Sequence, residues 1–246
     1  MASERLFSFG DTENKPLVRM LSDIKELLYD GVWASSAPEM QLYFMYRDLG
    51  LTPEDRRAIR DGGLRYDITV IPPRMLGVEY VKTAGHCHPV VPGQGMRYPE
   101  LYHVLEGEAH YLLQKNDGGG VSDVVLVKAS RGDNVIIPPG YGHVTINASG
   151  KELKMGNWVC RDFNSDYCIY REKKGAAYFE LDGGRLVANG NYGGLPNVRF
   201  FGPTNYGEFG LKKGRDSYNM IRDLDALDYL KNPAAHARLF NLLFKL

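Results

Sequence analysis

Hydrophobic and polar residues follow two different periods along the chain, one typical of helices and one typical of strands. Between Leu17 and Leu28 the apolar residues recur at helical spacing, which predicts a helix over residues 17–29. Residues 52–55 read Thr-Pro-Glu-Asp, which combines an N-cap, a proline at the first helical position and an acidic first turn. Helices are therefore expected ahead of the first strands.

From about Tyr66 the pattern changes to short runs of β-branched and aromatic residues separated by turn residues. We predict successive strands over residues 66–71, 78–83, 102–106, 109–114, 124–127, 134–137, 143–147 and 153–160. A further pair, residues 178–181 and 186–188, turns at residues 182–184. Many short strands without intervening helices favour a sandwich or barrel, so we expect a mainly β domain.

Helical spacing returns near the C-terminus, after a glycine-rich passage over residues 189–214. Apolar residues recur at this spacing from Met220 to Leu230, and Asn232 with Pro233 predicts the start of a last helix. We therefore divide the chain into a domain of residues 1–190 with its N-terminal lead-in and a partly helical extension of residues 191–246. The extension could cover a barrel edge, complete a dimer interface, close over a site or simply pack as an appendage.

Composition and charge narrow the classes of function. Of the 246 residues 43% are hydrophobic and 24% charged, and no stretch has the apolar length of a membrane span. Lys+Arg and Asp+Glu number 30 each, so no overall charge favours nucleic acid or an anionic membrane as a partner. Residues 1–16 lack the regions of a secretion signal, and the three cysteines form no disulfide framework. We expect a cytoplasmic protein with reduced cysteines.

Four residues in the strand region could bind one divalent metal ion. His86 and His88 are two residues apart and share one face of a strand, whereas Cys87 between them points away. Glu100 opens the next predicted strand, and His143 begins a later one directly after a Pro/Gly turn. Three imidazoles and a carboxylate suit Fe²⁺, Mn²⁺, Ni²⁺ or Zn²⁺, with Fe²⁺ as the first candidate. Two octahedral positions would stay open for substrate oxygens.

The spacing around these residues resembles the two cupin motifs. The second motif is present as Gly132, Pro138, Gly140, His143 and Asn147, and the first as His86 and His88 followed by Glu100 and Gly107. Eleven residues separate His88 from Glu100, more than in the usual motif, and we expect this insertion, residues 89–99, to loop over the mouth of the site. The resemblance implies a cupin barrel, that is, a double-stranded β-helix or jelly roll, with N-terminal helices and a helical C-terminal extension.

Within the cupins the chain resembles the archaeal-type, metal-dependent glucose-6-phosphate isomerases. The resemblance covers about residues 18–190 and is carried by residues 18–23, 43–46, 83–86, 111–114 and 138–147. It implies interconversion of glucose 6-phosphate and fructose 6-phosphate with one divalent metal ion per chain, in a homodimer. Glu100 would be both metal ligand and catalytic base for an enediolate route, and a metal-assisted hydride shift is the alternative.

The resemblance also implies which residues contact the sugar phosphate. Thr69, Thr83 and Gly85 would line the phosphate end, and Tyr43, Tyr102 and Tyr167 would lie along the sugar, although each could equally be a packing residue. Where the family usually has a histidine that contacts substrate, this chain has Ser165. That difference keeps alternatives open: another sugar isomerase, an iron dioxygenase, or a sugar-binding cupin without turnover. We interpret His103, His110, His236 and Gln114 as structural or exposed.

Overall fold

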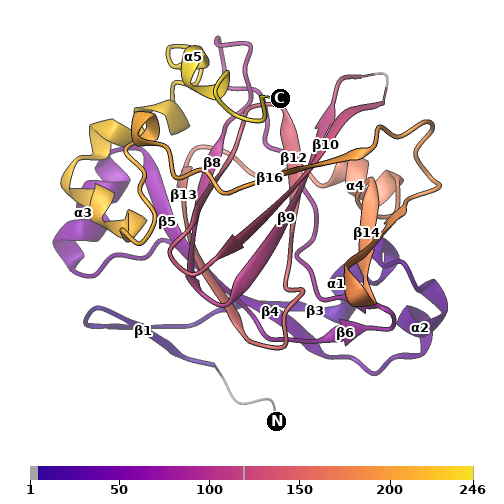
Figure 1. Cartoon of the computed structure of the whole chain (residues 1–246). Coiled ribbons are helices and arrows are strands. Elements are labelled where there is room, and N and C mark those ends of the chain that lie inside the picture. Colours follow the sequence, from indigo (N-terminus) through magenta and orange to yellow (C-terminus); the bar gives the residue numbers. More distant parts are fainter. Residues whose placement is uncertain (1–4, 119, 246) are drawn as a thin grey trace.

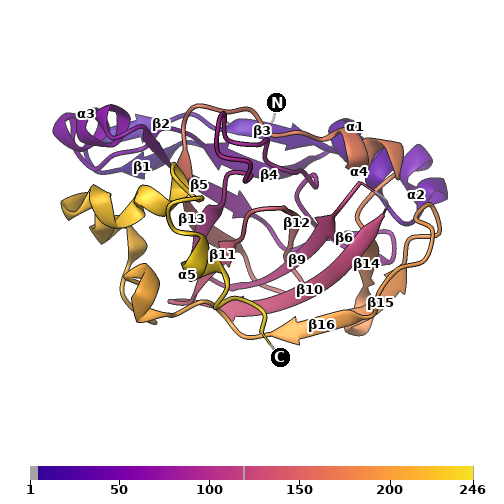
Figure 2. The same ribbon diagram turned by 90° about the horizontal axis from the view of Figure 1, so that it is seen from above.

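The computed structural model describes residues 5–118 and 120–245. Residues 1–4 of the predicted domain 1–190 and residue 246 of the predicted extension 191–246 lie outside this part. Two large sheets lie as two layers, with β4 and β5 in one and β9 and β10 in the other (Figures 1 and 2). The six-stranded sheet has the order β11 (Asn134–Ile137), β8 (Glu100–Glu106), β13 (Leu153–Cys160), β5 (Leu64–Ile71), β4 (Gln41–Tyr46) and β3 (Leu17–Met20). The four-stranded sheet has the order β12 (Tyr141–Ile146), β9 (Glu108–Asn116), β10 (Val121–Ser130) and β16 (Val198–Phe201).

Two smaller sheets and several short helices surround these layers. The strands are β1 (Phe7–Phe9), β2 (Thr12–Asn14), β6 (Met75–Leu76), β7 (Glu79–Tyr80), β14 (Tyr178–Leu181) and β15 (Arg185–Ala188). The α-helices are α1 (Leu21–Ile24), α2 (Gly31–Ser36), α3 (Pro53–Asp61), α4 (Cys168–Glu172) and α5 (Ala237–Phe240). The 3₁₀ helices are η1 (Lys25–Leu27), η2 (Asp182–Gly184), η3 (Gly207–Phe209), η4 (Ser217–Arg222) and η5 (Leu224–Leu230). None of the described helices is long and apolar enough to cross a membrane.

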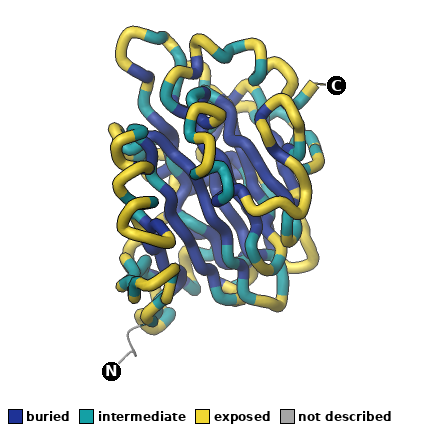
Figure 3. Tube along the Cα trace, turned by 90° about the vertical axis from the view of Figure 1, so that its left-hand side faces the viewer, coloured by how far each residue is buried: buried dark blue, intermediate teal, exposed yellow. Residues whose placement is uncertain are grey.

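Side chains alternate along each strand, so some are buried in the core that separates the two sheets and the others pack on the outer face of a sheet. On β11, Val135 and Ile137 join the core between the sheets, whereas Ile136 packs on the outer side. In Figure 3 the strands are mostly buried and the outer loops exposed. The expected mainly β jelly roll is confirmed. The described strands form separate sheets rather than one continuous ladder, and isolated bridges such as His86 with His143 add pairing outside those sheets.

Strand periodicity predicted the central elements well and the helical segments less well. The predicted bounds of β11, β13 and β14 are those of the structure, and Thr52 caps α3 by accepting a 3.1 Å hydrogen bond from the Asp55 backbone. The helix predicted over residues 17–29 is wrong in its first turn, because Leu17–Met20 pairs with β4 as an edge strand. The helix predicted near Met220–Leu230 is a pair of 3₁₀ segments, and the last helix is confined to Ala237–Phe240.

The C-terminal extension covers the outer face of the six-stranded sheet. Its residues Phe209, Tyr218 and Leu227 are buried in one cluster with Tyr66 and Trp158 from β5 and β13. The Trp158 indole donates a 2.9 Å hydrogen bond to the carbonyl of Ser217. Figure 1 shows this segment in yellow beside α3. The extension therefore packs against the β domain, and its strand β16 also pairs with β10 at the edge of the four-stranded sheet, so packing as an appendage and covering a sheet edge both occur.

Candidate metal centre

The four predicted ligands meet between the two large sheets. His86 and His143 form an antiparallel bridge in which each backbone N–H donates to the other's carbonyl, at 3.3 and 3.0 Å. Glu100 is the first residue of β8, and His88 follows His86 on the same short extended segment. One ligand atom from each of His86, His88, Glu100 and His143 lies within 4.8 Å of the others. This is the proximity that a single ion requires.

Hydrogen bonds to neighbouring residues orient two of the ligands. His88 Nδ1 lies 2.9 Å from the carbonyl oxygen of Tyr98, which can only accept, so the proton belongs on Nδ1 and Nε2 offers a lone pair. That Nε2 is 3.3 Å from Glu100 Oε2. The amide of Asn157 donates a 2.7 Å hydrogen bond to Glu100 Oε1. Imidazole and carboxylate are thus held facing each other, as in sites where outer hydrogen bonds fix metal ligands.

Glu100 Oε2 is the feature that fits a cation. It is buried, it has no hydrogen-bond donor among the described residues, and it lies 3.3 Å from His88 Nε2 and 3.4 Å from His143 Nε2. A buried carboxylate oxygen without a donor is costly. A divalent ion among these atoms would satisfy it, so the residues present fit a metal.

Burial and neighbouring charge set the protonation states in the cluster. Burial, reinforced by the neighbouring His88, lowers the pKa of His86 to about 4, and burial lowers that of His143 well below its ordinary value. For Glu100 burial acts to raise the pKa, but the neighbouring imidazoles of His88 and His143 outweigh it and lower the pKa to about 2. Neutral His86 and His143 with an ionised carboxylate are the forms that bind metals.

The other candidate residues lie elsewhere, as predicted. His103 Nδ1 is 3.0 Å from Asn134 Oδ1, His110 pairs with Glu180, and His236 pairs with Asp228. Gln114 accepts a hydrogen bond from the Ala177 backbone. Cys87 packs in a cluster on the outer side of the four-stranded sheet, away from the ligands. The alternation argument therefore separated the four clustered residues from the histidines that pair elsewhere.

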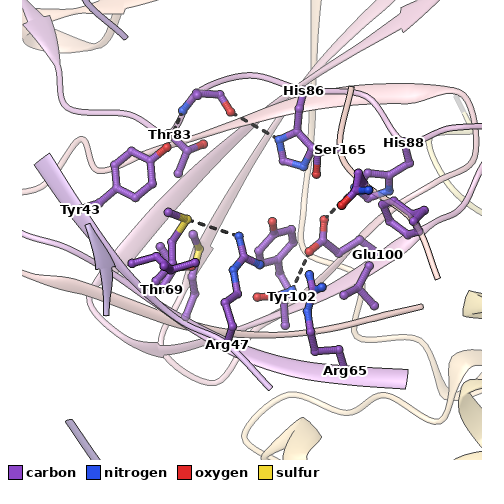
Figure 4. A pocket seen from close by; sticks show the side chains of 18 of the residues that line it. Tyr43, Arg47, Arg65, Thr69, Thr83, His86, His88, Glu100, Tyr102 and Ser165 are labelled. Carbon is purple, nitrogen blue, oxygen red and sulfur yellow. Dashed lines mark hydrogen bonds and ion pairs between the residues drawn. The ribbon is translucent and has the colours of Figure 1, made fainter. Parts of the chain in front are cut away.

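A cavity of about 330 Å³ opens beside the cluster and receives most of the predicted substrate residues. Its lining includes Tyr43, Thr69, Thr83, Tyr102 and Tyr167, together with Ser165, and Figure 4 shows several of them around His86 and Glu100. Two of these hydroxyl groups already accept a hydrogen bond within the protein. The Tyr43 hydroxyl accepts one from the Ala84 backbone at 3.0 Å, and Thr83 Oγ1 accepts one from the Thr145 backbone at 3.0 Å. Burial raises the pKa of Tyr102 well above its ordinary value, so its hydroxyl stays protonated.

Gly85 is not among the residues that line this cavity. A Cβ at this position would lie 2.1 Å from Cδ1 of Tyr170 and 2.8 Å from Cγ2 of Val144. Close packing against α4 therefore accounts for the glycine without any contact to a ligand.

The insertion between His88 and Glu100 does not cover the mouth of the site, contrary to expectation. It folds back on itself through a bridge between Val90 and Arg97, and none of residues 89–99 lines the cavity. The amide of Gln94 instead donates to the carbonyl of Lys231 and to Asn232 in the C-terminal extension. The insertion contributes to the site from outside, through the Tyr98 carbonyl that holds His88.

Sequence reasoning missed four polar residues of the cavity: Arg47, Arg65, Asn157 and Asn164. A signal was present in Asp67, a carboxylate in the middle of an otherwise apolar run. A buried carboxylate needs partners of opposite charge, and Asp67 contacts both arginines. Arg65 shares a face of β5 with Asp67, whereas the contact of Arg47 depends on how β4 and β5 pair, which the sequence alone does not give.

Comparison with known proteins adds a family match and several similar sequences. A family model described as "Glucose-6-phosphate isomerase (GPI)" matches residues 18–196. The chain is 28% identical over 187 residues to a protein named glucose-6-phosphate isomerase from Thermococcus litoralis, an alignment that covers 75% of this chain and 91% of that protein. It is 27% identical over 159 residues to one of the same name from Pyrococcus horikoshii, covering 65% of this chain and 77% of that protein.

Solved structures resemble only part of the chain. A structure of oxalate decarboxylase from Bacillus subtilis is similar over 51% of this chain and 26% of its own, with a TM-score of 0.34 and 12% identity. The cupin domain of CENP-C from Drosophila melanogaster is similar over 47% of this chain and 65% of its own, with a TM-score of 0.30 and 17% identity.

Proposed function

The chain belongs to the glucose-6-phosphate isomerase family, and we propose that His86, His88, Glu100 and His143 hold the divalent ion with which it interconverts glucose 6-phosphate and fructose 6-phosphate. The two facing sheets and the two histidine-bearing motifs are those of a cupin. The observation that carries the proposal is the position of Glu100 Oε2, buried, without a donor and within 3.4 Å of two imidazoles.

Three nitrogens and one oxygen, with no thiolate, suit a catalytic transition-metal site. When bound, the ion would supply a Lewis acid that polarises the substrate carbonyl and stabilises negative charge on the substrate oxygens. We propose Fe²⁺ as the native metal, with Mn²⁺, Ni²⁺ and Zn²⁺ as alternatives.

The reaction must move a hydrogen between C2 and C1 of the sugar. Among the described residues that line the cavity Glu100 is the only carboxylate, so it is the one candidate there for a proton-transfer route. Metal binding would lower the basicity of this carboxylate, so the alternative, in which hydrogen passes directly from C2 to C1 as a hydride, stands beside it. Solvent deuterium distinguishes the routes, because a hydride shift incorporates none into product.

The remaining cavity residues would hold the sugar phosphate. In this proposal Thr69 and Thr83 would bind the phosphate end, and Tyr43, Tyr102 and Tyr167, which line the same cavity, would contact the sugar. Tyr102 presents a protonated hydroxyl 3.2 Å from His143 Nε2 and could donate to a substrate oxygen beside that ligand. Gly85 does not line the cavity, and we assign it no contact with the phosphate. Its lack of a side chain lets Tyr170 pack closely against the backbone.

We further propose a cytoplasmic homodimer in which residues 1–190 form the catalytic domain and residues 191–246 an extension packed on it. The burial of extension residues against β5 and β13 supports the packing, and the end of the family match at residue 196 supports the boundary. Sedimentation equilibrium of the purified chain tests the dimer.

Addition of metal to stripped protein tests the activity. Protein treated with EDTA and then supplied with Fe²⁺, Mn²⁺, Ni²⁺ or Zn²⁺ should convert fructose 6-phosphate into glucose 6-phosphate only when metal is present, as followed by a coupled dehydrogenase. Conversion that is equally fast without metal would contradict the proposed centre, and no conversion with any of the metals would contradict the proposed reaction.

A further inference from the structure

One wall of the cavity carries two guanidinium groups. Arg47 directly follows β4 and Arg65 lies near the start of β5, and both line the cavity with side chains that are 36% and 28% exposed. Figure 4 shows both on the side of the cavity opposite Thr83 and His86. The nearby histidine ligands and hydroxyl groups supply no comparable positive charge in this wall.

A single buried carboxylate holds both arginines. Asp67 is 0% exposed; its Oδ2 lies 2.5 Å from the Arg47 Nη1 and 2.9 Å from the Arg65 Nε, and its Oδ1 accepts from the Asp48 backbone at 2.9 Å. Arg65 thus uses its Nε toward Asp67 and keeps its terminal amino groups for other partners. One arginine would suffice to neutralise Asp67, so the second guanidinium charge faces the cavity, where the proposed metal ion would compensate Glu100.

The strand register places Arg47 nearest the predicted phosphate end, with Arg65 four residues from Thr69 along β5. Arg65, Asp67 and Thr69 alternate along the same face of β5. Met45 on β4 pairs with Thr69, and Arg47 lies two residues beyond Met45 on the same face. Arg47 Nη2 lies 3.3 Å from the sulfur of Met45, a weak acceptor that a stronger one could replace. Arg47 therefore lies between Thr69 and the carboxylate of Glu100.

We propose that Arg47 and Arg65 bind the phosphoryl group of the sugar phosphate, and that Asp67 positions both guanidinium groups for it. This inference rests on the proposed function. Thr69 and Thr83 are neutral donors and cannot balance the charge of the phosphoryl group, whereas the two arginines can. A phosphoryl dianion moved out of water needs such compensation. The planar guanidinium offers paired N–H donors that match two phosphate oxygens, which a hydroxyl cannot do.

Binding to metal-free protein separates this subsite from the metal centre. EDTA-treated protein should bind fructose 6-phosphate and inorganic phosphate in calorimetric titrations but not fructose. Arg47→Met and Arg65→Met should each weaken binding of fructose 6-phosphate about tenfold to hundredfold, the range for a charge-assisted hydrogen bond. Arg47→Lys keeps a charge beside Asp67 but loses the paired donors, and should weaken binding several-fold while the thermal midpoint stays near that of the unaltered protein.

Arg161→Met is the matched control. Arg161 has a side chain that is 25% exposed and pairs with Asp48 at 3.4 Å, but it does not line the cavity. Its loss removes the same charge and should leave the affinity for fructose 6-phosphate unchanged. Unchanged affinity in folded Arg47→Met, Arg65→Met and Arg47→Lys, or an equal loss in Arg161→Met, would overturn the proposal. Failure of metal-dependent turnover with arginine-dependent phosphate binding intact would instead contradict only the proposed reaction.

Discussion

Asn157 and Glu100 lie on the neighbouring strands β13 and β8, and the amide of Asn157 donates a 2.7 Å hydrogen bond to Oε1 of Glu100. This contact occupies one carboxylate oxygen and turns the other toward His88 and His143. The amide thus makes the carboxylate a one-oxygen ligand with a fixed direction.

Replacement of Asn157 by leucine should weaken metal binding about tenfold to hundredfold, the usual effect of losing a hydrogen bond that orients a ligand. Glu100 Oε1 would be left without a donor, and the carboxylate could rotate. Competition with a chelator of known affinity measures the change. Gln114→Leu removes another buried amide, which contacts Ala177 and Tyr192, and should lower stability without changing metal affinity. Equal metal affinities in the two variants would refute the orienting role of Asn157.

Gly85→Ala should lower the free energy of unfolding by about 1–3 kcal/mol, the cost of overpacking. The new methyl group would lie 2.1 Å from the Tyr170 ring, which must move. Urea denaturation measures the loss, and the second substitution Tyr170→Leu should recover part of it. If Gly85→Ala kept full stability but lost affinity for fructose 6-phosphate, Gly85 would contact substrate after all.

The stability of the metal-free protein should fall as the pH is lowered from about 6.5 toward 4. Burial lowers the pKa of His86 to about 4 in the folded state, below its ordinary value of 6.5, so the unfolded chain takes up the proton first. The contribution of neutral His86 is complete above pH 6.5 and is lost progressively as the pH falls through this window. Urea midpoints at a series of pH values measure the slope. His86→Gln should flatten it, whereas His236→Gln, outside the site, should not; the same slope in all three proteins would argue against a buried neutral His86.

Leu227→Ala should cost about 2–5 kcal/mol of stability, as expected for a fully buried leucine. Leu227 is 0% exposed in the cluster that joins the C-terminal extension to the six-stranded sheet. Leu242→Ala, at a position that is 37% exposed, is the control and should cost far less. Similar unfolding curves for both variants would mean that the extension does not share the core of the β domain.

The sequence predicted the elements whose residues carry a local signal. Residues 134–137 are a short β-branched run that ends at Pro138, and residues 153–160 follow the turn residues Ser149 and Gly150; both strands have the predicted bounds. The cluster of His86, His88, Glu100 and His143 was predicted because spacing within a strand decides which side chains share a face. Leu17–Met20 was misassigned because its apolar residues fit a helix as well as a strand, and only pairing with β4 decides between them.

The missed features depend on contacts between distant segments. Arg47 and Arg65 become neighbours only through the register of β4 and β5, and Gly85 acquires its packing role only when α4 places Tyr170 against it. The insertion was expected over the site because it lies between two ligands in the chain. Gln94 in the insertion instead donates hydrogen bonds to Lys231 and Asn232. No local sequence pattern predicts this contact.

The most direct test of the metal centre is the metal content of purified chains, measured by plasma mass spectrometry after gel filtration. The unaltered protein should carry one divalent ion per chain, His143→Ala should carry almost none, and His103→Ala should retain its ion, because His103 contacts Asn134 rather than the cluster. Full metal retention by His143→Ala, or equal loss from both variants, would contradict the assignment of His86, His88, Glu100 and His143 as the ligands.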